Sequence, residues 1–171
     1  MDMLMSGQPS DAKERAESIN ADHYSALRSR IEVFTGAREL VADLASRGYR
    51  VVLATSAPKD ELEGLLEELD IDEHVFAVTS AEDVDTAKPE PELVALALDR
   101  AEADASAAVF IGDSVWDMRA AGRAGVAAIG VLSGGTSREA LLAAGAAAVF
   151  DDVAALHAHL DEEPASTLFG L

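Results

Sequence analysis

The sequence predicts an α/β protein in which a parallel sheet of the Rossmann type lies between two layers of helices. The first observation is a regular alternation from residue 37 onward, where segments with helical spacing precede short runs rich in β-branched residues. The second is the length of the helical segments, which suits the crossovers between neighbouring parallel strands. The third is composition, because 49% of the 171 residues are hydrophobic, enough for the core of one domain.

The first elements are a helix, a linker and the beginning of the alternation. Residues 10–30 have helical spacing, with Ser10 as a cap and Ile19 among the apolar residues of one face. Residues 31–36 are a linker that ends at a glycine. The alternation then opens with a helix at 37–47, a strand at 49–55, a helix at 58–69 and a strand at 75–79. Gly48 can end the first of these helices, and the strand YRVVLAT has the composition of a buried strand.

The alternation continues to the last helix. We expect helices at 90–103, 115–124, 137–144 and 152–160, and strands at 107–112, 126–131 and 147–150. Residues 161–171 are expected to be a frayed tail. Ligands of such sheets bind beyond the carboxyl ends of the strands, so the residues that follow each strand are the candidates for function.

The charge of the chain excludes several classes of partner. The 13 basic and 32 acidic residues give a net charge of −19, which repels nucleic-acid phosphates and anionic lipid. No apolar run reaches the length of a membrane span. The absence of cysteine excludes disulfides and thiolate chemistry and fits a reducing cytoplasm. The expected partner is therefore a small molecule, and an anionic one would need a local cation or a bound metal.

Thr55 and Ser56 stand at the end of the first strand of the alternation, immediately before a helix. A hydroxyl group and free backbone N–H groups at such a turn suit a phosphate or carboxylate ligand. The alternative interpretation is that Ser56 only caps the helix that follows.

Asp113 and Asp117 follow the strand at 107–112 in the segment Gly-Asp-Ser-Val-Trp-Asp. They are one helical turn apart, so both carboxylates can face the same point. Two oxygen donors beside an open position suit Mg²⁺, with water and substrate oxygens as the other ligands. The alternative is that one aspartate caps the helix and the other is solvated, but an apolar strand leading directly into this segment favours the metal site.

Lys88 precedes Pro89 in a loop between these two strand ends, and it is one of only three lysines, with Lys13 and Lys59. A residue before proline is held extended, so the side chain is displayed to a ligand. Its point charge can meet a phosphoryl oxygen or a carboxylate. A solvated loop lysine is the plainer alternative.

Together these residues supply a hydroxyl group, an ammonium group and paired carboxylates along one edge of the sheet. Such a set fits phosphoryl transfer, in which catalysis is mostly positioning and neutralisation of charge. A nucleophile is not evident among them.

In this order, Thr55-Ser56, Lys88-Pro89 and Gly112-Asp113-Ser114-x-x-Asp117 resemble the motifs of the haloacid dehalogenase superfamily. The resemblance covers roughly residues 10 to 160 and is nearest to the branch of phosphoglycolate phosphatase and β-phosphoglucomutase. It implies a Mg²⁺-dependent phosphatase of a small phosphorylated metabolite. Thr55, the Ser56 N–H and Lys88 would bind phosphate. Asp113 and Asp117 would form the metal site, and Lys88, Asp113 and Asp117 would act in catalysis.

The resemblance also divides the chain and exposes one departure from the family. Residues 1–34 would be a remnant of a helical cap, 35–160 the α/β core and 161–171 a C-terminal tail. The family's first motif, Asp-x-Asp-Gly-Thr at the end of a central strand, supplies the nucleophile and the general acid and base. This chain has no such motif, because Asp2 stands in Met-Asp-Met-Leu-Met without a following Gly-Thr.

Three explanations of this departure remain open. The first, which we favour, is that the chain is an incomplete reading of a longer protein. The second is that it is a naturally shortened, inactive relative. The third is that another chain of a homo-oligomer supplies the strand. The alternative function is accordingly an inactive module that binds phosphate and metal or regulates a partner. Dehalogenation and phosphomutase chemistry use related cores and stay open, and the substrate is not named by the sequence.

Overall fold

The computed structural model describes residues 15, 19, 31–55, 57, 59–84 and 88–171. The predicted helix at 10–30 lies outside the described residues, apart from Arg15 and Ile19, which are helical. Close contacts divide the chain into two compact units, Met1–Val33 and Phe34–Leu171, and the elements below belong to the second.

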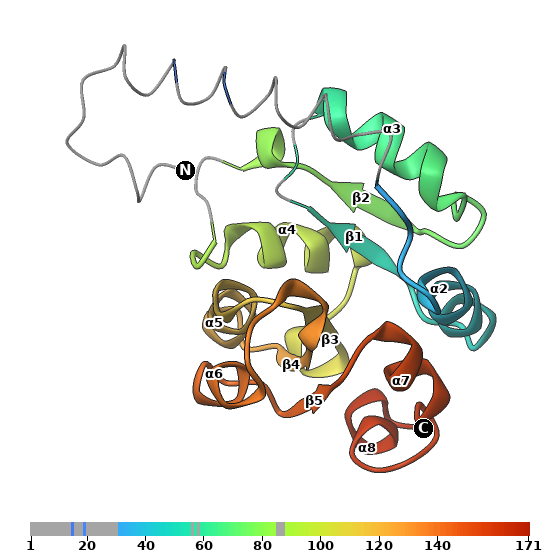
Figure 1. Cartoon of the computed structure of the whole chain (residues 1–171), viewed down its shortest axis with the longest axis vertical. Helices are drawn as coiled ribbons and strands as arrows, with labels where there is room; N and C mark the ends of the chain where they lie inside the picture. The colour runs from blue at the N-terminus through green and yellow to red at the C-terminus, as the bar shows by residue number, and fades with distance from the viewer. Residues whose placement is uncertain (1–14, 16–18, 20–30, 56, 58, 85–87) are drawn as a thin grey trace. The chain divides into compact units, whose positions relative to one another are not determined.

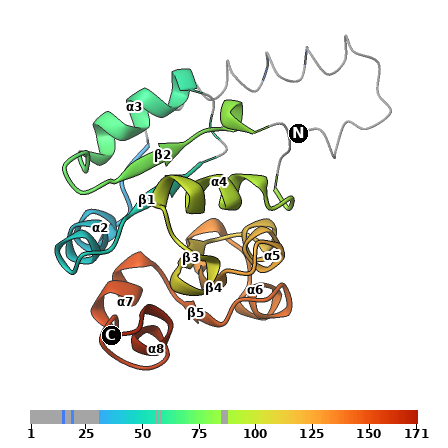
Figure 2. The same ribbon diagram turned by 180° about the vertical axis from the view of Figure 1, so that it is seen from behind.

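The second unit is an α/β fold in which every strand pairing is parallel (Figures 1 and 2). Its strands are β1 (Val52–Ala54), β2 (Ala77–Thr79), β3 (Val109–Gly112), β4 (Ala127–Val131) and β5 (Ala148–Phe150). Its α-helices are α2 (Ala37–Ser46), α3 (Lys59–Leu69), α4 (Glu92–Ala101), α5 (Val115–Arg123), α6 (Arg138–Ala143), α7 (Val153–Ala158) and α8 (Ala165–Phe169). The predicted α/β class is confirmed, with shorter elements than expected.

The strands form two separate sheets among the described residues. One sheet pairs β1 with β2, and the other has the order β3-β4-β5. In the first, Leu53 lies opposite Val78, and in the second Ile111 lies opposite Ile129. β1 and β3 are not hydrogen-bonded to each other, which agrees with the sequence-based expectation that a central strand is missing from this chain.

Helices cover both faces of the three-stranded sheet. Side chains of Phe110 and Ala128 point to a core formed with α4, α5 and α6, in which Met118 is fully buried. Side chains of Ile111 and Ile129 point to a second core formed with α2, α7 and α8. Because successive side chains of a strand alternate between faces, neighbouring residues of β3 and of β4 contribute to opposite cores.

The C-terminal residues are ordered against the core, so the expectation of a frayed tail is wrong. The hydroxyl group of Tyr49 donates a hydrogen bond of 2.7 Å to the carbonyl oxygen of Phe169. The rings of these two residues meet edge to face at 5.8 Å between centroids, and Ala165 is fully buried. The sequence concealed this because the apolar residues of α8 follow a run of acidic residues and a proline.

Candidate functional site

The Gly112–Asp117 segment lies where β3 passes into α5. Ser114 is the N-cap residue of α5, and its hydroxyl oxygen accepts a hydrogen bond from the backbone N–H of Asp117 at 3.2 Å. The Oδ2 atom of Asp117 in turn accepts from the backbone N–H and the hydroxyl group of Ser114, at 3.1 and 2.7 Å. This capping box fixes the carboxylate of Asp117 at the first turn of the helix.

Lys88 reaches this turn from the loop before α4. Its Nζ atom donates a hydrogen bond of 2.8 Å to Oδ1 of Asp117 and lies 6.0 Å from the centre of the Phe110 ring. The Lys88 and Asp117 side chains are 18% and 8% exposed. Arg123 of α5 donates to the carbonyl oxygen of Pro89 at 3.1 Å, which ties the lysine loop to the helix that carries Asp117.

The two aspartates have opposite electrostatic environments. Burial raises the pKa of Asp117, but the Lys88 charge and the hydrogen bonds from Lys88 and Ser114 outweigh it, so the pKa is lowered overall. For Asp113, burial and the negative charge of Asp117 together raise the pKa. Asp117 is therefore a firmly ionised partner of Lys88, whereas Asp113 carries a charge that a bound cation would stabilise.

Two glycines provide room for the aspartate side chains, because they have no Cβ atom. A Cβ atom on Gly112 would lie 2.5 Å from Cβ of Asp117, and a Cβ atom on Gly134 would lie 2.5 Å from Cγ of Asp113. Gly134 follows β4, whose carboxyl end lies at the same edge as that of β3. Gly134 was not among the residues predicted from the sequence, although the Gly-Gly pair just after a predicted strand was the available signal.

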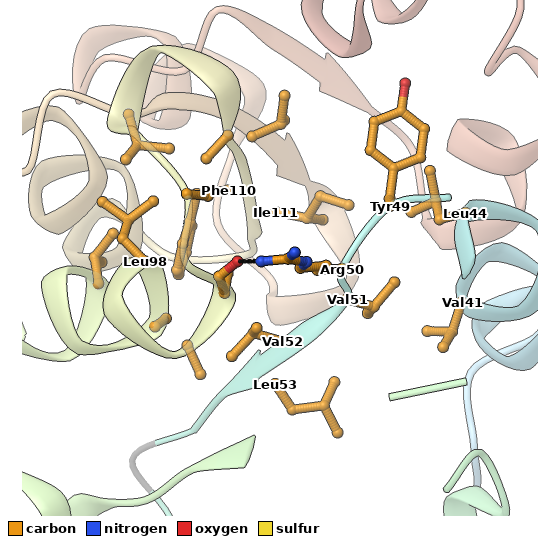
Figure 3. Close-up of a pocket in the computed structure, with 18 of the residues that line it drawn as sticks. Val41, Leu44, Tyr49, Arg50, Val51, Val52, Leu53, Leu98, Phe110 and Ile111 are labelled. Carbon is orange, nitrogen blue, oxygen red and sulfur yellow. Dashed lines mark hydrogen bonds between the residues drawn. The ribbon is translucent and has the colours of Figure 1, made fainter. Parts of the chain in front are cut away.

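Thr55 lies at the carboxyl end of β1, where its Oγ1 accepts a hydrogen bond of 3.0 Å from the backbone N–H of Ala57. It lines a cavity of about 1140 Å³ between β1 and β3, which Lys88, Asp113 and Asp117 do not line (Figure 3). Ser56, the other predicted phosphate ligand, lies outside the described residues. The structure thus brings Lys88, Asp113 and Asp117 together and places Thr55 on the neighbouring cavity.

The described residues contain no group of three or more histidine or acidic side chains placed to hold a metal ion. The carboxylate pair of Asp113 and Asp117 is a smaller donor set. Both oxygens of Asp117 already accept hydrogen bonds, so Asp113 is the better placed of the two to face a cation. No helix in the described part is long and apolar enough to cross a bilayer.

Comparison with known proteins gives one family match and several relatives. A family model described as haloacid dehalogenase-like hydrolase matches residues 2–131. A phosphoglycolate phosphatase of Rhodospirillum rubrum is 37% identical over 124 residues, which is 72% of this chain and 51% of the relative. The probable phosphatase IndB of Dickeya dadantii is 36% identical over 132 residues, 75% of this chain and 57% of the relative. The chain spans about half the length of these curated relatives.

Solved structures of similar fold cover most of the chain. The crystal structure of a hydrolase from Pseudomonas syringae has a TM-score of 0.86 at 31% identity and covers 94% of this chain and 77% of its own. CbbY from Rhodobacter sphaeroides, solved in complex with phosphate, has a TM-score of 0.70 at 26% identity, with coverage of 88% and 67%.

Proposed function

The chain belongs to the haloacid dehalogenase-like hydrolase family, and from that premise we propose that it is a Mg²⁺-dependent phosphatase of a small phosphorylated metabolite. The observation that carries the proposal is the Lys88–Asp117 ion pair beside Asp113, at the carboxyl end of β3. Relatives named as phosphatases, and a similar structure that holds phosphate, support the same reaction class.

In this proposal Lys88 supplies positive charge to the phosphoryl group. Asp117 holds the ammonium group at 2.8 Å and keeps it oriented, while the ring of Phe110 lies beneath it. The hydroxyl group of Thr55 and the backbone N–H of Ser56 would contact the phosphoryl oxygens from the carboxyl end of β1. These groups neutralise and position the phosphoryl group, which is most of what phosphoryl transfer requires.

The residues at this site suit Mg²⁺. The ion usually takes one or two carboxylate ligands from a protein and keeps several water molecules. Asp113, with Asp117 nearby, is therefore enough for the protein's part of the coordination. The raised pKa of Asp113 indicates an acidic group whose charge lacks full compensation within the protein. When bound, the ion would neutralise charge on the phosphoryl oxygens. Asp113 would hold the ion, and Gly134 would keep room for the carboxylate.

The nucleophile is the part of the reaction that these residues leave unassigned. Asp117 is committed to Lys88 and Ser114, and we assign Asp113 to the metal. We therefore propose that the attacking group lies outside the described residues. The same observation favours the second candidate function, a module that binds phosphate and Mg²⁺ without turnover.

The composition of the chain supports a proposal for its location and for the class of its partner. The net charge of −19 and the absence of cysteine favour a cytoplasmic protein that meets small metabolites, with no nucleic-acid or membrane partner. We also keep the proposed division into a cap remnant at residues 1–34, a core at 35–160 and a tail at 161–171, and the proposal of a homo-oligomer.

The test is release of inorganic phosphate with and without Mg²⁺, from phosphoglycolate, a sugar phosphate and an aryl phosphate. Lys88→Met and Asp113→Asn should each abolish Mg²⁺-dependent release, whereas Asp151→Asn, at an exposed ion pair, should not. Phosphate binding without release would select the inactive module. Release that survives both substitutions would overturn the proposed site.

A further inference from the structure

The loop that carries Lys88 connects the carboxyl end of β2 to the beginning of α4, and it opens with a short 3-10 helix, η2 (Ala81–Asp83). Residues 85–87 of this loop lie outside the described residues. Lys88 itself stands in a turn and belongs to no helix or strand. Its position beside Asp117 therefore depends in part on how the ends of the loop are held.

Asp83 closes the start of this loop onto Ser80, the residue that follows β2. The Oδ2 atom of Asp83 accepts hydrogen bonds from the backbone N–H of Ser80 at 2.7 Å and from the Ser80 hydroxyl group at 2.9 Å. The backbone N–H of Asp83 donates to the carbonyl oxygen of Ser80 at 3.2 Å, and Ser80 is 2% exposed. These reciprocal bonds hold the turn after β2 in one conformation.

Arg100 of α4 holds the other carboxylate oxygen of Asp83. Its Nη2 atom lies 3.1 Å from Oδ1 of Asp83, and the two side chains are 32% and 21% exposed. Its Nη1 atom donates a hydrogen bond to the carbonyl oxygen of Val78 in β2. The hydrogen bonds from Ser80, together with the guanidinium group of Arg100, outweigh desolvation and lower the pKa of Asp83. The pair is therefore a charged one that joins α4 to β2 and η2.

This contact joins the two ends of the loop to each other. Arg100 lies about two helical turns after Glu92, the first residue of α4, and α4 packs along β1 and β2 (Figure 1). The bond from Arg100 to Asp83 thus runs from the helix that follows the loop to the turn that begins it. A loop with both ends held has fewer conformations, so the lysine between them is confined more closely.

A second arginine holds the loop beyond its lysine. Arg123 of α5 donates to the carbonyl oxygen of Pro89 at 3.1 Å and to Oε1 of Glu90 at 2.7 Å. The side chains of Arg123 and Glu90 are 48% and 51% exposed, so water weakens this ion pair. Asp83 and Arg100 are more shielded, and Arg100 also bonds to the backbone of β2. Of the two anchors, the Asp83–Arg100 pair is therefore expected to hold the loop more firmly.

We propose that Asp83 and Arg100 are positioning residues for Lys88, which fix the approach of its ammonium group to the phosphoryl group. They contact Ser80 and Val78, and they act on Lys88 through the loop. The alternative is that they only close the turn after β2, but Ser80 and Asp83 already close it, and Arg100 adds the connection to α4. The expected effect on phosphate binding rests on the proposed function, whereas the confinement of Lys88 does not.

The position of Lys88 can be measured without activity, by NMR of the purified chain with isotopically labelled lysine. The chain has three lysines, and Nζ of Lys88 lies 6.0 Å from the centre of the Phe110 ring. The ring current displaces the resonances of the Lys88 side chain from those of a solvated lysine. Asp83→Asn, which keeps the shape of the side chain and removes its charge, should move these resonances toward the solvated position. The signals of Lys13 and Lys59 should not move.

Phosphate affinity supplies the second readout. Calorimetric titration with inorganic phosphate in the presence of Mg²⁺ should show about tenfold weaker binding in Asp83→Asn than in the wild type, as for groups that orient a binding residue. In the Lys88→Met background the same substitution should have no effect on affinity, because its effect passes through Lys88. The matched control is Glu102→Gln, which removes the exposed ion pair with Arg50 at the end of α4 and should change neither readout.

Arg100→Lys serves as a milder second variant, because it keeps a positive charge but lacks the forked guanidinium group that bonds Asp83 and Val78 together. It should move the Lys88 resonances in the same direction by a smaller amount. Unchanged Lys88 resonances in both folded variants would overturn the inference, as would an equal loss of phosphate affinity with and without Lys88. If the wild type binds no phosphate but the Lys88 resonances move as expected, the positioning role stands and the proposed function fails.

Discussion

The ammonium group of Lys88 and the carboxylate of Asp117 lie 2.8 Å apart, although the two residues are 29 positions apart in the sequence. The pair connects the loop before α4 to the first turn of α5. Because both side chains are largely shielded from water, removal of one partner leaves a charge that solvent compensates poorly.

We predict that Lys88→Met destabilises the fold by about 1–3 kcal/mol, since it leaves the Asp117 carboxylate with only the donors of Ser114 and the backbone N–H of Asp113. Denaturant unfolding measures this free energy. The control is Asp151→Asn, which removes the exposed ion pair with Arg138 and should have a much smaller effect. An equal loss of unfolding free energy in the two variants would contradict a larger contribution from the buried pair.

The same substitution should change the acid sensitivity of the protein. The folded-state pKa of Asp117 is lowered, so its contribution to stability is complete above the ordinary aspartate pKa of about 3.9 and is lost as pH falls through the folded value. In Lys88→Met the pKa of Asp117 should rise, and the acid-induced loss should begin at higher pH. An NMR titration of the Asp117 carboxyl carbon gives the pKa directly; an unchanged value would contradict the assignment.

Asp113 should make stability depend on pH in the opposite direction. Its folded-state pKa is raised, so the folded protein loses stability as pH rises from the ordinary aspartate value through the raised one. Asp113→Asn is therefore expected to be more stable than the wild type at neutral pH. The advantage should disappear below about pH 3, where the carboxyl group is protonated in both states. A variant less stable at pH 7 would show that Asp113 is already compensated within the protein.

Gly134→Ala should displace the Asp113 carboxylate, because the new Cβ atom would lie 2.5 Å from Cγ of Asp113. We expect Mg²⁺ affinity to fall by about tenfold, in the range found for groups that orient metal ligands. The control is Gly122→Ala in α5, where a Cβ atom meets nothing within 4 Å, and where alanine should add about 0.5–1 kcal/mol of stability. Calorimetric titration with Mg²⁺ distinguishes them, and unchanged affinity in Gly134→Ala would exclude a positioning role.

The ordered C-terminus gives a separate prediction. Tyr49→Phe keeps the ring contact with Phe169 but loses the hydrogen bond to its carbonyl group, at an expected cost of about 0.5–1.5 kcal/mol. Tyr49→Leu loses both and should also expose residues 165–171 to proteolysis. If neither variant changes the unfolding free energy, the tail does not contribute to the fold.

The order of helices and strands could be predicted because each element carries a local signal. Glycine after α2 and the β-branched run of β1 are examples, and the Asp113–Asp117 spacing likewise placed both aspartates at one turn. The pairing of Lys88 with Asp117, and the contact of Gly134 with Asp113, depend on how distant strand ends meet in space. The separation of β1 from β3 agrees with the missing central strand that the family resemblance indicated, although the composition of either strand alone does not reveal whether both of its edges are paired.

The central claim is that Asp113 and Lys88 form one site for Mg²⁺ and phosphate, and calorimetry on the purified chain tests it most directly. Inorganic phosphate should bind more tightly when Mg²⁺ is present, and Mg²⁺ more tightly by the same factor when phosphate is present, because the coupling is reciprocal. Asp113→Asn should abolish the coupling, and Lys88→Met should weaken phosphate binding. Absence of binding by the folded chain, or coupling that persists in Asp113→Asn, would contradict the account.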